Sequence, residues 1–255
     1  MRLTGSGQPK LLVGCLVFFL GSNVNAQTAK EIIANYLDSV SLGNPAKWHQ
    51  VKTFSATAKG YFNAERMSNA ISLTEKGSTT YTKIYKLWPE KMKEELYSDS
   101  LYTTLTSEVL FIKNKRIFKM GTMSPVEGEG DNSLWFDFLP VIVENYVKAA
   151  KAVAYKGVSH LPGLTLAVHE IEIQSKDKIR RLFFNVDTNL LEALYFPEAD
   201  IYWFYSDYTN VEGYLMPLTT MSISEGGIFS RTKYMSMSFN PDINLNVFEF
   251  KDVRK

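Results

Sequence analysis

The side chains that could support catalysis or bind a metal are few and widely separated. The three histidines are His49, His160 and His169, and no two of them stand four residues apart, as ligands on one helix face would. None belongs to a His-Glu-x-x-His motif or has a cysteine nearby, so the spacing does not support a zinc site. We expect each histidine to be a surface or hydrogen-bonded residue, and we expect no metal and no other cofactor.

Acidic residues give two weaker signals. Glu127, Glu129 and Asp131 alternate with glycines, but their spacing completes no calcium-binding loop, so we expect a solvated loop. Glu170 and Glu172 share one face of a predicted strand. Paired carboxylates can do acid–base work, but on an outward strand face they are usually only solvated.

The usual linear signatures of enzymes do not occur. The sequence has neither the Gly-x-Ser-x-Gly nucleophile elbow nor a glycine-rich phosphate loop. We therefore expect a protein that is not an enzyme, although a catalytic set dispersed in sequence leaves no linear trace.

The first predicted element is an amphipathic helix over residues 28–40. Thr28 followed by Glu31 is a capping-box pattern, and Gly43 ends the helix. The apolar residues between them have helical spacing: Ile32, Ile33, Tyr36, Leu37 and Val40.

From Thr53 onward the apolar period changes to two, which predicts strands. We expect them near 52–62, 68–76, 79–88, 91–97, 101–106, 108–113 and 115–120, followed by a loop over 121–133. Strands resume near 152–159 and continue to the end. Turn signals recur every roughly 10–14 residues there, as in an antiparallel meander.

The segment 134–147 differs from its surroundings because almost all of it is apolar. It predicts a helix that is buried or faces a ligand, with Pro140 kinking it or starting its second half.

Alternation assigns side chains to strand faces. Phe54, Ala56, Ala58, Gly60 and Phe62 share one face, and the three central ones are very small. If that face points inward, the space above it must be filled by a helix or left open for a ligand. In the last strand Met235, Met237 and Phe239 are expected to share a face. For each single residue, a place in an ordinary core remains the simpler alternative.

The first 26 residues have the pattern of a signal peptide. Arg2 and Lys10 precede and flank the start of an apolar run, 11–20, which is too short to span a membrane, and Ala26 offers a cleavage site. Leu12-Val13-Gly14-Cys15 resembles a lipid-attachment motif, but it opens the apolar run instead of closing it, which favours cleavage after Ala26. Residues 27–255 are then a single exported domain. The formal net charge of +1 and the mixed signs along the chain argue against a nucleic-acid partner.

Several C-terminal motifs resemble a recurrent pattern of the periplasmic outer-membrane lipoprotein carrier family (LolA/LolB-like). They are Tyr205-Ser206-Asp207-Tyr208, then Glu212-Gly213-Tyr214-Leu215-Met216-Pro217, and the closing Phe239-Asn240-Pro241. The segment Leu87-Trp88-Pro89 is similar to the family's strand-end proline segment, and the resemblance extends over nearly all of residues 27–255.

The resemblance implies a mainly β (α+β) fold, a curved, incomplete antiparallel β-barrel with helices covering its concave face. It also implies a periplasmic protein that shields lipid or lipoprotein acyl chains during transport, acting in outer-membrane lipoprotein sorting. Its partners would be a lipid or acylated lipoprotein and a membrane-bound donor or acceptor protein. Such carriers often place arginine before the strand-end proline, where it holds a helical lid closed. Trp88 stands there instead and cannot make the same charged contacts.

Three hypotheses remain open from the sequence: a carrier of acyl chains, an envelope-sensing or protein-interaction module of the same fold, and an enzyme with a dispersed site. The carrier hypothesis makes large apolar residues the lining of a hydrophobic cavity. We expect this lining to include Trp88, Trp135, Phe138, Ile142, Phe184, Trp203 and Met221.

Overall fold

The computed structural model of the chain describes residues 28–63, 78–88, 91–112, 115–129, 140–161, 164–175, 178–224 and 229–250. The expected signal peptide and its cleavage site lie outside the described residues. So do the predicted strand 68–76 and the first part of the predicted helix, 134–139.

Two α-helices and two short 3-10 helices are present in the described part of the chain. They are α1 (Ala29–Val40), η1 (Pro45–Gln50), α2 (Pro140–Ala149) and η2 (Leu245–Phe248). The predicted capping box of α1 is confirmed, because the Glu31 amide donates to Thr28 Oγ1 and the Thr28 amide donates to the Glu31 carboxylate. Gly43 has a φ of +83°, which suits the predicted helix end.

All strands of the described residues belong to one antiparallel sheet. They are β1 (Thr53–Asn63), β2 (Ser78–Leu87), β3 (Lys91–Tyr97), β4 (Leu105–Ile112), β5 (Lys115–Met120), β6 (Val126–Glu129), β7 (Ala152–His160), β8 (Ala167–Gln174), β9 (Ile179–Asn185), β10 (Leu191–Phe196), β11 (Ile201–Val211), β12 (Tyr214–Ser224) and β13 (Phe229–Phe239). The spatial order is β6-β5-β4-β3-β2-β1-β13-β12-β11-β10-β9-β8-β7. Two meanders therefore meet where β1 pairs with β13.

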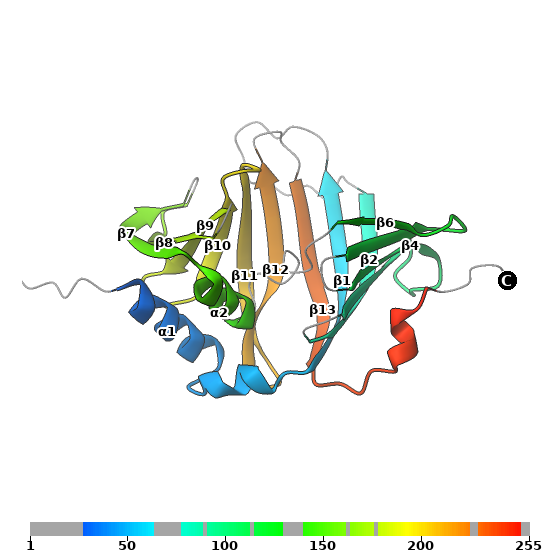
Figure 1. Cartoon of the computed structure of the whole chain (residues 1–255), viewed down its shortest axis with the longest axis horizontal. Helices are drawn as coiled ribbons and strands as arrows, with labels where there is room; N and C mark the ends of the chain where they lie inside the picture. Colours follow the sequence, from blue (N-terminus) through cyan, green and yellow to red (C-terminus); the bar gives the residue numbers. More distant parts are fainter. Residues whose placement is uncertain are drawn as a thin grey trace, which may run out of the picture.

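The sheet is strongly curved and open between its edge strands β6 and β7 (Figure 1). α1 packs against β7 and β12, and α2 packs against η1, so the helices cover one half of the concave face. α1 buries Ile32, Ile33 and Tyr36 there. The predicted fold, an incomplete antiparallel barrel with helices on its concave side, is confirmed.

A β-bulge interrupts the pairing of β13 with β1. Thr57 pairs with Ser236, but Ala58 pairs with Tyr234, so Met235 has no partner on β1. Met235 is consequently 62% exposed, while Met237 and Phe239 are buried. The expectation that Met235 shares their face is therefore wrong: the extra residue reverses the alternation and turns Tyr234, Thr232 and Ser230 to the inner face.

Apolar side chains are buried on both faces of the sheet in its second half. The larger cluster contains Leu182, Phe184 and Tyr205 together with the helix residues, and a smaller one contains Phe183 and Phe204. Because neighbouring strand residues point to opposite faces, the smaller cluster lies on the outer face. The prediction that strand 201–208 is covered on both sides holds for residues 202–205, whereas Ser206 and Asp207 are exposed.

Three predicted boundaries need correction. Residues 101–104 form a turn and not a strand, because the Asp99 carboxylate accepts hydrogen bonds from the amides of Leu101, Thr103 and Thr104. The predicted loop 121–133 contains β6, which pairs with β5 and is joined to it by the Lys115–Glu127 ion pair. Within the described residues the helix predicted over 134–147 is α2, Pro140–Ala149, so it ends two residues later than predicted.

The motifs that resemble the carrier family fix turns and strand ends. Glu212 accepts hydrogen bonds from Ser238 and from the amide of Phe239, and Asn240 accepts one from the amide of Lys52. Tyr214 packs against Trp48 of η1, with ring centroids 4.4 Å apart. These residues connect the beginning of the sheet to its end.

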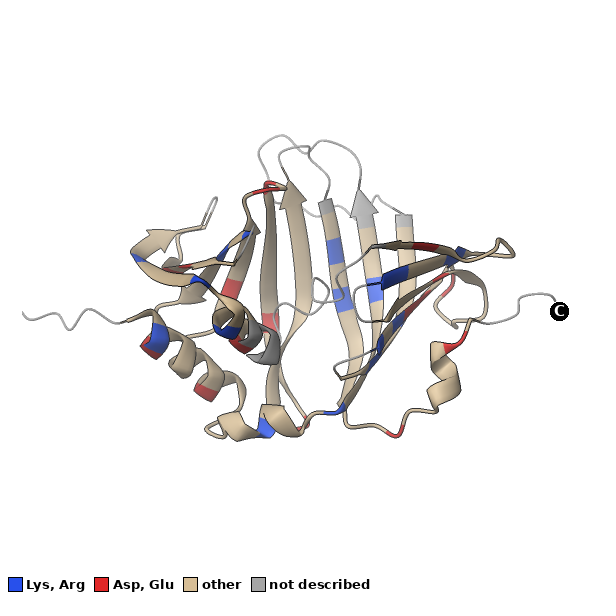
Figure 2. Ribbon diagram, in the orientation of Figure 1, with Lys and Arg blue, Asp and Glu red and all other residues tan. Residues whose placement is uncertain are grey.

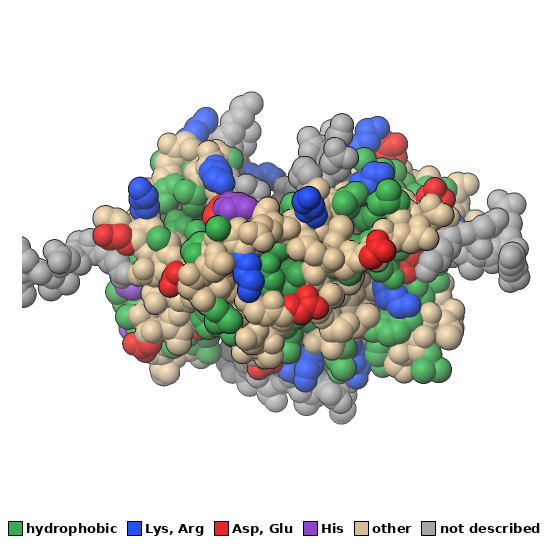
Figure 3. All heavy atoms as spheres, turned by 90° about the horizontal axis from the view of Figure 1, so that it is seen from below, with side chains coloured by type: hydrophobic (Ala, Val, Ile, Leu, Met, Phe, Trp, Pro, Cys, Tyr) green, Lys and Arg blue, Asp and Glu red, His purple; other side chains and the backbone are tan. Residues whose placement is uncertain are grey.

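Charges of both signs are spread over the strands (Figure 2). Lys59 and Lys233 are paired across β1 and β13 on the face opposite Ala58, which makes a small basic area on the outer surface. Seen from the end that carries η1, apolar side chains form separate groups among polar ones (Figure 3). No described helix is long and apolar enough to cross a membrane.

Phe184 offers a test of this packing. Its side chain is fully buried and its ring centroid lies 5.2 Å from that of Tyr36 on α1. Phe184→Ala should lower the free energy of unfolding by roughly 3–5 kcal/mol, because it removes a large side chain from a packed core. Urea denaturation measures this loss, with Leu101→Ala, at an 80% exposed residue, as the control. A loss no greater than that of the control would contradict the placement of α1.

Candidate functional site

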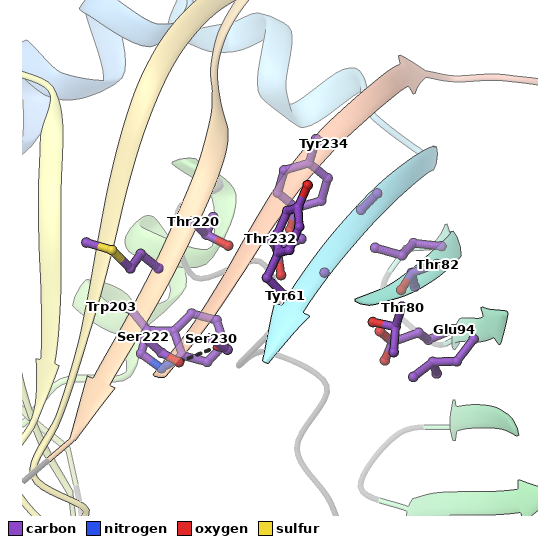
Figure 4. Close-up of a pocket in the computed structure, with 15 residues that line it drawn as sticks. Tyr61, Thr80, Thr82, Glu94, Trp203, Thr220, Ser222, Ser230, Thr232 and Tyr234 are labelled. Carbon is purple, nitrogen blue, oxygen red and sulfur yellow. Dashed lines mark hydrogen bonds between the residues drawn. The ribbon is translucent and has the colours of Figure 1, made fainter. Parts of the chain in front are cut away.

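A cavity of about 350 Å³ lies on the inner face at the centre of the sheet. Six adjacent strands line it, from β11 through β12, β13, β1 and β2 to β3 (Figure 4). The lining residues are Ala58, Gly60, Tyr61, Thr80, Thr82, Ile84, Glu94, Leu96, Trp203, Thr220, Met221, Ser222, Ser230, Thr232 and Tyr234. Its size is near the lower end of the roughly 300–1,000 Å³ of small-molecule sites.

The small residues of β1 help to create this space. Ala58 and Gly60 line the cavity, as the expected inward face of the strand 53–62 allows. A Cβ at Gly60 would lie 2.8 Å from Thr80 Oγ1, so a larger residue there would require the Thr80 side chain to move. Both options that the sequence left open above this face are observed: Ala56 and Ala58 are buried in the main core, whereas Gly60 borders open space.

The large residues expected to line a cavity are divided by the structure. Trp203 and Met221 line it, and Met221 also packs on the outer cluster. Trp88 lies beside the main core with Lys86 Nζ 5.0 Å from its ring centroid, and Phe184 is buried beneath α1. Trp135 and Phe138 lie outside the described residues, and so does the side chain of Ile142.

A band of hydroxyl groups forms much of the cavity wall. β2 contributes Thr80 and Thr82, β12 contributes Thr220 and Ser222, and β13 contributes Ser230 and Thr232. Ser222 and Ser230 hydrogen-bond to each other across their strands (Figure 4). The β13 members point inward because of the bulge at Met235, which sequence alternation did not reveal.

Glu94 is the single carboxyl group among the lining residues. Its side chain is only 6% exposed, and burial raises its pKa to about 7, with Arg116 acting in the opposite direction. Tyr234 lies near enough to feel this charge, and burial raises the pKa of its hydroxyl too. The sequence could have indicated Glu94, because it lies between Met92 and Leu96 on the same strand face. The neighbouring charged residues obscured this pattern.

The described helix α2 is held over the sheet by a buried cation. The Arg180 guanidinium of β9 lies 4.3 Å from the ring centroid of Tyr146 on α2. Arg180 is 6% exposed, and its Nε has no hydrogen-bond partner in the described part of the chain. A second, more open hollow of about 620 Å³ lies between α1, α2 and β7.

The chemically versatile side chains considered first do not converge on the cavity. His49 is 3.7 Å from Glu144, His169 Nδ1 is 3.0 Å from the Tyr155 hydroxyl, and Glu170 and Glu172 interact with Arg181. Burial lowers the pKa of His169. Within the described residues, no group of three or more His, Cys, Asp or Glu side chains could hold a metal ion. The described residues around the cavity form a concave surface that is suited to holding a ligand.

Comparisons with known proteins place this architecture in a known fold. No protein-family model matches the sequence, and no curated protein matches it significantly. A LolA superfamily protein from Nitrosomonas europaea has a similar structure, with a TM-score of 0.57 and 11% identity over 88% of this chain and 98% of that chain. A DUF1329 family protein from Desulfovibrio piger gives 0.56 and 12% over 86% and 97% of the two chains.

A third similar structure is a domain from Vibrio parahaemolyticus attributed to outer membrane lipoprotein sorting. It has a TM-score of 0.54 and 11% identity over 85% of this chain and 97% of that chain. The resemblance to the LolA-type carriers found in the sequence is thus confirmed in the fold.

The pKa of Glu94 predicts a pH-dependent stability. The folded state raises this pKa from 4.5 to about 7, so the folded protein holds the proton more tightly than the unfolded chain. The stabilising contribution of the protonated carboxyl is fully present below pH 4.5 and is lost as the pH rises to about 7. The Glu94→Gln variant cannot ionise at this position. The difference in unfolding free energy between Glu94→Gln and wild type should therefore shift in favour of the variant by roughly 2 kcal/mol when the pH is raised from 5 to 8.

Urea denaturation of both proteins at the two pH values measures this gain. Asp242→Asn, which removes an exposed carboxylate, is the matched control and should show no such gain. An equal difference between wild type and Glu94→Gln at both pH values would contradict the assignment.

Proposed function

We propose that this chain is an exported, non-enzymatic binding protein whose half-barrel shelters the acyl chain of a lipid or an acylated lipoprotein. The observation that carries the proposal is the central cavity on the concave face, bounded by six strands and containing Trp203, Ile84 and Leu96. Each CH₂ group removed from water contributes about 0.8 kcal/mol, so shielding a chain requires no chemical step.

The fold supports the same function. It is shared with a LolA superfamily protein and with a domain attributed to lipoprotein sorting, and a curved open sheet gives a chain access to its inner face. We infer that residues 27–255 form one domain in the periplasm after removal of the signal peptide 1–26. For the exported protein, we expect mass spectrometry to give an intact mass equal to that of residues 27–255.

The cavity size limits what is held. About 350 Å³ suits one chain or chain end more than a whole multi-chain lipid. The cargo is therefore expected to leave part of itself outside the cavity, where a membrane-bound donor or acceptor protein would meet it.

Filling the cavity tests the proposal. Thr232 lines the cavity, whereas Lys233, the next residue on β13, points to the outer face and is exposed. Thr232→Trp should weaken binding of a neutral naphthalene fluorescent probe at least about tenfold, because the indole occupies the ligand space. Lys233→Trp should bind the probe as wild type does. Fluorescence titration of both variants, with urea midpoints as a check on folding, makes the measurement; unchanged binding by a folded Thr232→Trp protein would contradict the proposal.

A second candidate is a protein-interaction module that uses the β6 edge of the sheet. Val126 on β6 is 62% exposed, and Met120 and Met123 nearby are 52% and 57% exposed. An edge strand with exposed apolar residues can accept a strand of a partner. Val126→Lys would weaken such pairing and leave probe binding unchanged, whereas Thr232→Trp would do the reverse.

A further inference from the structure

The hydrogen bonds and ion pairs of Glu94 differ from those of the other buried acidic residues near it. Glu95, its neighbour on the outer face, accepts a hydrogen bond of 2.6 Å from the Tyr97 hydroxyl and lies 3.3 Å from Lys93 Nζ. Glu108 lies 2.6 Å from the same ammonium. Glu94 is more than nine-tenths buried and lines the cavity, yet no donor in the described residues hydrogen-bonds to it.

None of the charged groups that the structure describes near Glu94 forms an ion pair with it. Arg116 on β5 is exposed and acts on it only through its electrostatic field. Lys86 on β2 shares the inner face, but its ammonium lies over the Trp88 ring. Tyr234 on β13 is near enough to interact electrostatically and is itself hydrogen-bonded with Thr220. A buried carboxylate without a partner is costly, and a ligand that supplies one recovers that cost.

The hydroxyl band beside Glu94 supplies further acceptors. Thr82 pairs with Leu96, two residues along β3 from Glu94, and Thr232 and Thr220 face the cavity from the opposite strands (Figure 4). An ammonium group carries three N–H donors, which match one carboxylate and two hydroxyl oxygens. An anionic head group would instead bring a second negative charge to the carboxylate.

We propose that Glu94 and the surrounding hydroxyls bind the head group of the ligand, and that this ligand is an amphiphile with a primary ammonium next to its apolar chain. The inference rests on the proposed function, because it places the head group of the ligand at one end of the same cavity. Apolar lining residues such as Ile84, Leu96 and Trp203 would then hold the chain.

The protonation of Glu94 makes the head-group preference depend on pH. Burial raises the pKa of this carboxyl to about 7, so the carboxylate that pairs with an ammonium becomes more populated as the pH rises. Between pH 6 and pH 8 the affinity for an amine should increase up to about tenfold, while the affinity for an alcohol of the same chain length stays constant.

Three dodecyl compounds test the proposal with one chain and three head groups. Dodecylamine, dodecanol and dodecanoic acid displace the neutral naphthalene probe from wild-type protein below their micelle concentrations. We expect dodecylamine to bind most tightly and dodecanoic acid least tightly at pH 8. Glu94→Gln should weaken dodecylamine about tenfold, leave dodecanol within about twofold and remove the pH dependence.

Two further variants keep the result interpretable. Glu94→Leu removes the acceptor altogether and should weaken dodecylamine at least as much as Glu94→Gln does. Asp242→Asn lowers the negative charge equally at an exposed residue and should bind all three compounds as wild type does.

Different results would contradict the head-group proposal and the carrier proposal. Equal affinities for the three compounds in wild type, or an equal change for all three in Glu94→Gln, would overturn the head-group assignment and leave the carrier function standing. No binding of probe or of any dodecyl compound to wild type would overturn the carrier function and this inference with it.

Discussion

The pairing of β1 with β13 is the constraint on which the rest of the molecule depends. These are the first and the last strand of the sheet in sequence, and their contact joins the β1–β6 meander to the β7–β13 meander. The bulge at Met235 lies within this pairing. A bulge bends its strand and increases the local twist, and here it also turns three residues of β13 inward. The same irregularity therefore shapes the sheet and supplies one wall of the cavity.

Two sets of contacts flank the end of this pairing at which Phe54 lies opposite Phe239. Around η1, Trp48 packs on Tyr214 and Phe239, and Lys47 Nζ donates to the Gly213 carbonyl. Beyond β13, the chain crosses the outer face of β3, where the Lys93 ammonium donates to the Glu249 carbonyl and pairs with Glu108. Buried charges satisfied in this way are tolerated in a fold, whereas Glu94 on the inner face of the same strand lacks such partners among the described residues. That contrast distinguishes a structural charge from one left available to a ligand.

Local patterns in the sequence predicted α1, the period-two strands and the general architecture, because capping and alternation act over a few residues. They did not predict the bulge at Met235, since an extra residue in one strand becomes visible only when its partner strand is known. The Asp99 turn and the β6 edge were missed for a similar reason. For the site, Trp203 and Met221 were identified by size and apolarity, but the hydroxyl band was not, because threonine and serine are common on solvated strand faces. Glu94 could have been found from its position between Met92 and Leu96 on an apolar face.

The central claim is that the inner face of this sheet holds an apolar chain. Native mass spectrometry of the protein purified from its host without detergent tests this claim most directly. The account predicts a one-to-one adduct that is released on denaturation and identified as a lipid or acylated peptide. The adduct should be absent from Thr232→Trp and present on Lys233→Trp. A wild-type protein found only at the mass of the polypeptide, which also takes up no added amphiphile, would contradict the account.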